Sequence, residues 1–154
     1  METNLRSAQL ASVPLKDLQA AEVMAPYPRT CSPYSTVTEA VLIFKDEDST
    51  MVPVVDAGKP LGIVTERDVA LAVPSHSMLA QQPVSGIMNE AILTALAETP
   101  LDQILRMMAE ANAHILFVVD IDGLLLGVIS WSDLVARLPS RTMTAISESQ
   151  EILR

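Results

Sequence analysis

The chain has 154 residues, of which 49% are hydrophobic, and its 19 acidic and 10 basic residues leave a net charge of −9. This length suits one domain or two small, closely packed halves, and the apolar content is sufficient for a core. The basic residues are scattered, whereas binding to a nucleic-acid backbone needs a basic face, so we expect no nucleic-acid partner.

No apolar run approaches the roughly 18 residues that span a bilayer, and the N-terminus lacks the basic and apolar regions of a signal peptide. The single cysteine, Cys31, cannot form an intrachain disulfide, which agrees with a reducing compartment. We therefore expect a cytoplasmic protein with no membrane insertion.

The first elements are predicted from patterns near the N-terminus. Residues 1–14 are polar and without periodicity, so we expect a flexible arm. The segment from Pro14 to Met24 predicts a short helix with proline at its start. A second helix is predicted by apolar residues at helical spacing, and its start is marked by a capping box of Thr36 and Glu39. The apolar positions are Val37, Ala40, Val41 and Phe44.

Two strands follow this helix, from Met51 to Val55 and from Pro60 to Thr65. Both are nearly continuous in apolar and β-branched residues, which is typical of strands covered on both faces. The four residues between them contain aspartate and glycine and predict a hairpin turn. A further helix begins at Glu66, and we expect the first repeat to occupy residues 15–73 and a polar linker to occupy residues 74–83.

The same order of elements returns in residues 84–138. Val23-Met24 recurs as Ile87-Met88 and Gly62 as Gly127. A helix is predicted by Leu101, Ile104, Leu105 and Met108, strands by residues 115–119 and 124–130, and a last helix from Trp131. Thr99-Pro100 predicts a capping residue followed by proline at the first helical position. Because an internal repeat folds as one unit used twice, we expect an α/β (α+β) fold with two strand-helix-strand-strand-helix repeats.

The end of the chain and several helix positions bear on assembly. In the tail, residues 139–154, Ile146, Ile152 and Leu153 have partly helical spacing, and the tail either packs back or lies in a dimer contact. Four apolar helix positions would form a larger exposed patch than a monomer normally has, and we therefore expect a homodimer that buries them. They are Val69, Leu71, Leu134 and Leu138.

Two tetrads carry the chemistry that the sequence offers. In each, a hydroxyl ends a strand and a carboxylate follows three residues later in the first turn of a helix. A carboxylate accepts both hydroxyls of a ribose, and a hydroxyl suits a phosphate oxygen. Ser/Thr-x-x-Asp is also an ordinary capping box, which stabilises a helix without a ligand, and both interpretations stay open. The candidate ribose and phosphate residues are Thr65, Arg67, Asp68, Ser130, Ser132 and Asp133.

Each copy opens with Val/Ile-Met and closes with Gly-x-x-Thr/Ser-x-x-Asp, and together the copies resemble a tandem pair of cystathionine-β-synthase (CBS) domains, the Bateman module. The resemblance runs from about Val23 to about Leu138. It implies two β-α-β-β-α repeats with pseudo-twofold symmetry and a central cleft for an adenosyl ligand: AMP, ADP, ATP, S-adenosylmethionine or NAD. It also implies a ribose role for Asp68 and Asp133, and pairing into a disc-like dimer.

The resemblance further implies an adenine pocket, which needs an apolar slot edged by polar backbone groups. Phe117 departs from the family's hydrophobic-proline pattern, which Pro53 keeps, and its ring either stacks on a base or fills the pocket. Trp131 likewise either stacks on a ligand or covers the core, and we favour the position over the core. Where the first tetrad has Arg67, the second has the neutral Ser132, so we expect the two half-sites to bind phosphate unequally. The implied pocket residues are Thr30, Met51, Val52, Pro53, Thr94, Ile115, Leu116 and Phe117.

The function that we expect is a non-enzymatic sensor of an adenosyl ligand that acts on a regulated protein in trans. The alternative is a structural or partner-binding module without a physiological nucleotide. An enzyme is disfavoured, because the sequence has no nucleophile-base pair or glycine-rich phosphate loop. His76, His114 and Cys31 make no zinc set, and residues 46–48 lack the spacing of a calcium loop. We therefore expect no catalytic residues, no metal site and no required cofactor.

Overall fold

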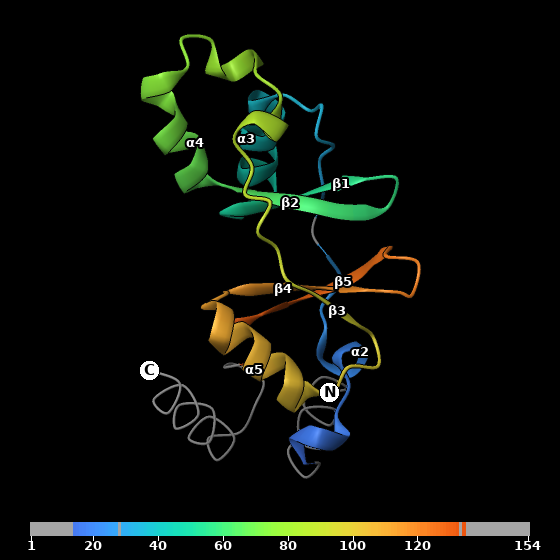
Figure 1. The fold of residues 1–154 in the computed structure, drawn as a ribbon. Helices are drawn as coiled ribbons and strands as arrows, with labels where there is room; N and C mark the ends of the chain where they lie inside the picture. Colours follow the sequence, from blue (N-terminus) through green and yellow to red (C-terminus); the bar gives the residue numbers. More distant parts are fainter. Residues whose placement is uncertain (1–13, 28, 133, 135–154) are drawn as a thin grey trace. The chain divides into compact units, whose positions relative to one another are not determined.

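The computed structural model of the chain describes residues 14–27, 29–132 and 134 (Figure 1). These residues form two compact units, each with its own core. The first-repeat unit consists of residues 27–92 and 122–125, and the second-repeat unit contains residues 14–26, 93–121 and 126–134. The predicted α+β class is confirmed. In the part of the chain that is described, no helix is long and apolar enough to cross a membrane.

The first-repeat unit is built on an antiparallel hairpin. Its strands pair from Met51 opposite Thr65 to Asp56 opposite Lys59, with an irregularity between Val54 and Val55. Ala57 and Gly58 have positive φ angles of 50° and 79°, as the predicted tight hairpin turn requires. The elements are α3 (Val37–Asp46), β1 (Met51–Asp56), β2 (Lys59–Thr65), α4 (Glu66–Ala72) and the 3₁₀ turns η2 (Val73–Ser75), η3 (Leu79–Gln81) and η4 (Val84–Gly86).

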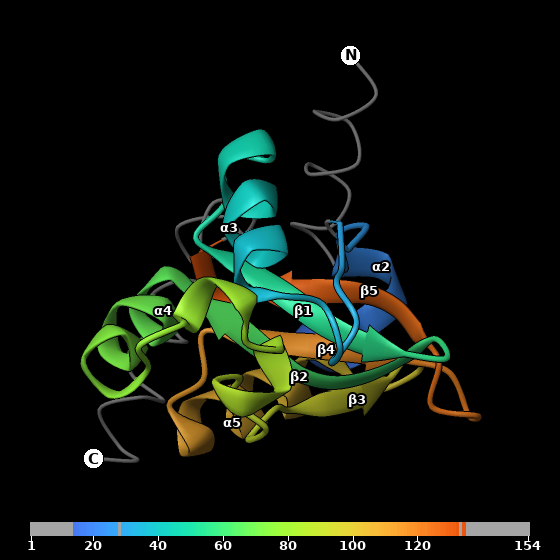
Figure 2. The same ribbon diagram turned by 90° about the horizontal axis from the view of Figure 1, so that it is seen from above.

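Helices α3 and α4 lie over the hairpin of this unit (Figure 2). The capping box of α3 is confirmed: Thr36 Oγ1 accepts from the Glu39 N–H at 3.2 Å, and Glu39 Oε2 accepts from the Thr36 N–H at 3.2 Å. The sequence predicts Val41 on the buried face, but this residue is 42% exposed, because the buried stripe of α3 continues through Ile43 and Phe44. The core of the unit contains Cys31, Ala40, Ile43, Phe44, Val52, Val54, Val64 and Val84.

The second-repeat unit has a three-stranded sheet in the order β3-β4-β5, with β3 parallel to β4. Helix α5 packs against this sheet (Figure 1), and its four predicted apolar positions, from Leu101 to Met108, are all buried. The unit contains η1 (Leu15–Asp17), α2 (Ala20–Val23), β3 (Thr94–Leu96), α5 (Leu101–Ala111), β4 (Ile115–Val119) and β5 (Leu125–Ser130).

Two predictions about helix ends in this unit are wrong, for one reason. The single helix predicted from Pro14 to Met24 is divided into η1 and α2, because Leu18 is extended and its carbonyl accepts from the Leu101 N–H at 2.8 Å. That bond also satisfies the first N–H of α5. The N-cap of α5 is therefore Pro100 with no side-chain cap, rather than Thr99.

A glycine in each repeat lets the Val/Ile-Met segment approach a strand. Ala25 and Val128 exchange two backbone hydrogen bonds of 2.9 Å, and a Cβ atom at Gly127 would lie 2.7 Å from Met24 Sδ. Asn89 and Ile63 exchange equivalent bonds beside Gly62. The duplicated methionine and glycine of the motif are thus packing partners, and each methionine opens one repeat while it packs in the unit of the other.

Candidate ligand site

The first tetrad lies where β2 ends and α4 begins. Thr65 is the N-cap of α4 in an extended conformation, and Asp68 is the third helical residue. The Thr65 N–H and hydroxyl both donate to Asp68 Oδ2, at 2.9 and 2.8 Å, and the Asp68 N–H donates to Thr65 Oγ1 at 3.1 Å. The capping interpretation of this tetrad is therefore realised in the structure.

The cap leaves one carboxylate oxygen and one cation of the tetrad available for a ligand. Asp68 is half-buried, and within the described ranges its second oxygen, Oδ1, accepts no hydrogen bond. Arg67 is exposed, and no ion pair involves it among the residues that the structure describes. Asp68 Oδ1, an acceptor for hydroxyl groups, and the Arg67 guanidinium, a donor for anions, thus both belong to the first turn of α4.

The described residues of the second tetrad repeat one backbone contact of the first. The Trp131 N–H donates to the His114 carbonyl at 2.9 Å, as the Glu66 N–H donates to the Thr50 carbonyl at 3.0 Å in the first tetrad. Ser130 ends β5 and is half-buried, whereas Ser132 is exposed. Trp131 packs partly against the core of its unit, in agreement with the core alternative. Asp133 lies outside the described residues.

The residues of the implied adenine pocket differ in exposure. In each repeat the first position of the strand, Met51 or Ile115, is half-buried, while the next two positions are buried. Phe117 is fully buried, so its ring fills space inside its unit and is not exposed for stacking on a base. The buried positions are Val52, Pro53, Leu116 and Phe117; Thr30 is half-buried and Thr94 is exposed.

Cys31 is not a reactive thiol at neutral pH. Its side chain is buried, and burial, followed by the charge of Glu39, raises the pKa of the thiol to about 11. The thiol is thus neutral near pH 7, and thiolate is the form that attacks or binds a metal. No group of three or more His, Cys, Asp or Glu residues that could hold a metal ion occurs within the described part of the chain.

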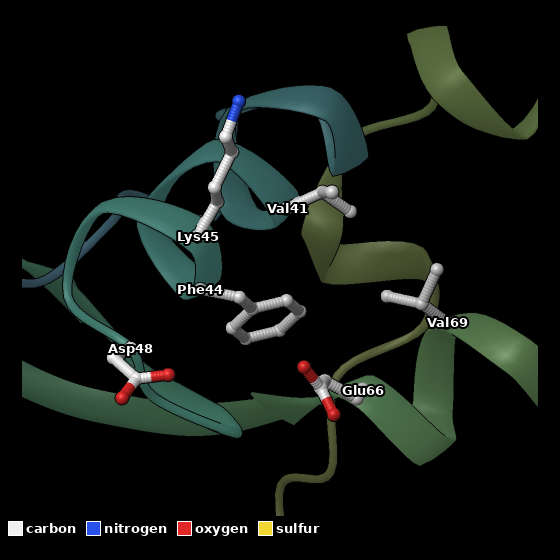
Figure 3. Close-up of a pocket in the computed structure, with 6 residues that line it drawn as sticks. All are labelled: Val41, Phe44, Lys45, Asp48, Glu66 and Val69. Carbon is white, nitrogen blue, oxygen red and sulfur yellow. The ribbon is translucent and has the colours of Figure 1, made fainter.

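A hollow between α3 and α4 was not predicted from the sequence, and it contains none of the predicted ligand residues. It has a volume of about 500 Å³, and Phe44 lies at its centre (Figure 3). An available signal was the uninterrupted apolar run of residues 40–44, which is longer than one buried face of a helix can use. The lining residues are Val41, Phe44, Lys45, Asp48, Glu66 and Val69.

Comparison with known proteins identifies the repeats. The CBS domain family model matches residues 20–75 and 84–140. The chain belongs to the CBS domain family. Each CBS match ends just beyond one of the two tetrads, so both candidate half-sites lie inside recognised domains.

Relatives and solved structures agree with this assignment. The CBS domain-containing protein YhcV of Bacillus subtilis is 30% identical over 105 residues, which cover 68% of this chain and 74% of YhcV. A putative acetoin utilization protein (AcuB) from Vibrio cholerae matches with a TM-score of 0.71 and 26% identity over 86% of this chain and 96% of that one. A CBS domain protein from Pyrobaculum aerophilum, complexed with AMP, has a TM-score of 0.71 and 22% identity, covering 85% and 99%.

Proposed function

We propose that the chain is a non-enzymatic sensor that binds an adenosyl ligand (AMP, ADP, ATP, S-adenosylmethionine or NAD) and acts on a protein partner in trans. The observation that carries the proposal is the Oδ1 atom of Asp68, which the cap does not use; Arg67, the residue before it in the sequence, is exposed. Membership of the CBS family supports it. The AMP complex of the Pyrobaculum aerophilum protein indicates the chemical class to test first.

The chemistry of the tetrad accommodates both of its interpretations. The cap uses Oδ2 of Asp68, so Oδ1 can accept from a ribose hydroxyl while α4 keeps its N-cap. The guanidinium of Arg67 is a suitable donor for a single phosphate. A ligand with one ribose and few phosphates therefore fits the charges of this tetrad.

Calorimetric titration with AMP tests the proposal. We expect Asp68→Asn to weaken AMP binding by about 1–3 kcal/mol, because the amide keeps a cap acceptor but lacks the charged acceptor for ribose. The matched control is Asp102→Asn, which changes an acidic residue in the first turn of α5, far along the chain from either tetrad. Equal affinity of wild type and Asp68→Asn would contradict the ribose role.

A second candidate function is a structural or partner-binding module with no physiological nucleotide. It is favoured by the burial of Val52, Pro53, Leu116 and Phe117, which leaves little of their surface for an adenine ring. Thermal-shift measurements with AMP, ADP, ATP, S-adenosylmethionine, NAD and cyclic dinucleotides separate the two functions. A stabilised midpoint with any adenosyl ligand supports the sensor, and no shift with all of them supports the second candidate.

We also propose that the chain acts as a homodimer, although one of the four apolar positions on which this prediction was based is buried within its own unit. The sequence predicts that Leu134 needs cover, yet it is only 2% exposed, because it packs in the core of the second-repeat unit. Leu138 lies outside the described residues. Leu71 of α4 is 64% exposed, and Val41 and Leu42 of α3 add apolar surface in the same first-repeat unit. Sedimentation of a 16.6 kDa monomer at micromolar concentration would contradict the dimer.

A further inference from the structure

The hollow between α3 and α4 continues into a second, apolar hollow. The second hollow has a volume of about 290 Å³ and shares Val41 and Val69 with the first, whose volume is about 500 Å³. Volumes of ~300–1,000 Å³ are typical of sites for small organic molecules. Both hollows lie within the first-repeat unit, and neither is lined by Thr65, Arg67 or Asp68. The second hollow is otherwise lined by Val37, Thr38, Leu42, Leu79 and Ala80.

The walls of the second hollow are almost entirely aliphatic. Val37 and Val41 lie one turn apart on α3, and residues of η3 complete the lining. Thr38 is the one polar side chain of this lining, and its hydroxyl donates to the Ala80 carbonyl at 2.8 Å. Val41 and Leu42 are 42% and 51% exposed, so an aliphatic chain laid against them would remove apolar surface from water. The second hollow is therefore suited to an aliphatic chain.

The first hollow has two carboxylates at its rim. Asp48 and Glu66 lie toward the same edge of the Phe44 ring, while the Lys45 ammonium group is turned away from the ring (Figure 3). Within the described ranges, none of these three charged groups forms an ion pair. The rim therefore offers two negative charges to a cation from outside the unit.

Asp48 occupies a backbone position that favours glycine. It follows the C-cap of α3 with a φ angle of 48°, and the Ser49 N–H donates to the Phe44 carbonyl at 3.0 Å, as in a Schellman motif. Glycine adopts this left-handed conformation without a Cβ penalty. A negative charge beside the C-terminal end of a helix is also unfavourable. The end of α3 therefore does not account for an aspartate here, whereas a cation at the rim does.

We propose that the two hollows form a binding site for an amphipathic ammonium compound, whose aliphatic chain lies in the second hollow and whose charged group lies between Asp48 and Glu66. Val37 and Lys45 are eight residues apart on α3, so this side of the site is about 12 Å long. Carboxylates accept charge-assisted hydrogen bonds from an ammonium group. The ligand class and the site differ from the adenosyl ligand and the tetrad, so the inference goes beyond the proposed function and does not depend on it.

Calorimetric titration of the full chain with octylammonium chloride, below the concentration at which it forms micelles, tests the site. Octanol and octanoate are matched probes that have the same chain with a neutral or a negative head group. We expect octylammonium to bind about fivefold more tightly than octanol, and octanoate to bind more weakly than both. Added NaCl should weaken the binding of octylammonium and not that of octanol. No binding of octylammonium, or affinities that do not depend on the head group, would overturn the proposal.

Asp48→Gly separates the ligand role of this residue from its structural role. Glycine suits the backbone and removes the charge beside the helix end, so we expect a urea midpoint equal to or above that of wild type. The affinity for octylammonium should nevertheless fall about two- to fivefold, and Glu66→Gln should lower it by a similar factor. The matched control is Glu47→Gln, which removes the same charge from an exposed residue that lines neither hollow. Unchanged affinity in Asp48→Gly and Glu66→Gln, or an equal loss in the control, would show that the head group lies elsewhere.

Leu42→Ala tests the position of the aliphatic chain. Leu42 lines only the second hollow, so we expect this variant to weaken octylammonium and octanol alike, by about threefold. Leu71→Ala is the control, because Leu71 is 64% exposed and lines neither hollow, and it should leave both affinities unchanged. If a second copy of the chain covers the hollows instead, octylammonium will not bind at concentrations where wild type sediments as a dimer, and the proposal fails.

Discussion

At the scale of single residues, Gly127 of the duplicated motif packs closely against Met24 and Ala25. A Cβ atom there would lie 2.7 Å from Met24 Sδ and 2.8 Å from the Ala25 carbonyl oxygen, and a backbone atom cannot yield as a flexible side chain can. We expect Gly127→Ala to lower the free energy of unfolding by about 1–3 kcal/mol.

Gly86→Ala provides the matched control for urea denaturation of Gly127→Ala. A Cβ atom at Gly86 has no neighbour within 4 Å, and this glycine does not have a positive φ. The control should leave the unfolding midpoint unchanged or raise it slightly. Equal losses of stability in both variants would show that close approach to Met24 is not the cause.

Cys31 predicts a pH dependence of stability. Burial raises the pKa of its thiol from 9.0 to about 11, so between these values the unfolded chain releases a proton that the folded chain retains. The stabilisation is therefore complete below pH 9 and is lost as the pH rises through 11. Denaturation of wild type and Cys31→Ala across this pH window should give free energies that converge as the pH rises. A constant difference would contradict the raised pKa.

At the scale of elements, the C-terminal end of α5 depends on a left-handed residue. Asn112 has φ 51° and ψ 41°, and the Ala113 N–H then donates to the Met108 carbonyl at 2.9 Å. Glycine adopts this conformation without a Cβ penalty, whereas alanine does not. We expect Asn112→Gly to keep or raise the free energy of unfolding and Asn112→Ala to lower it by about 1 kcal/mol. Urea midpoints in the reverse order would contradict the assignment.

The helix ends also show which structural features a sequence pattern predicts correctly. The capping box of Thr36 was predictable because both partners lie within one turn, and the apolar stripe of α5 because its period is local. The lead-in helix and the Thr99 cap were predicted wrongly, since a hydrogen bond between Leu18 and Leu101 replaces the local partners. The available oxygen of Asp68 could not be predicted, because spacing alone does not assign the two oxygens of one carboxylate.

At the scale of the whole molecule, we expect net charge to influence which adenosyl ligand binds. A chain with a net charge of −9 and one arginine in its first tetrad offers little to offset metal-free ATP, whose charge is about −4. We expect AMP to bind more tightly than ATP in calorimetry with EDTA, and Mg²⁺ to narrow the difference. Tighter binding of metal-free ATP than of AMP would show that this charge argument is wrong.

The sequence by itself determined the repeat, the family and the helix followed by a strand hairpin in each copy, because these depend on local period and on motifs that recur at a constant offset. The strand predicted to open the first copy is present only as an isolated bridge between Cys31 and Val54. Only the tertiary structure decided which oxygen of Asp68 the helix cap uses, which pocket positions are buried and where the hollow between α3 and α4 lies. These properties depend on contacts between segments distant in the chain, such as α3 with α4 and Gly127 with Met24. A one-dimensional pattern specifies which side chains are apolar, whereas packing decides which of them remain exposed.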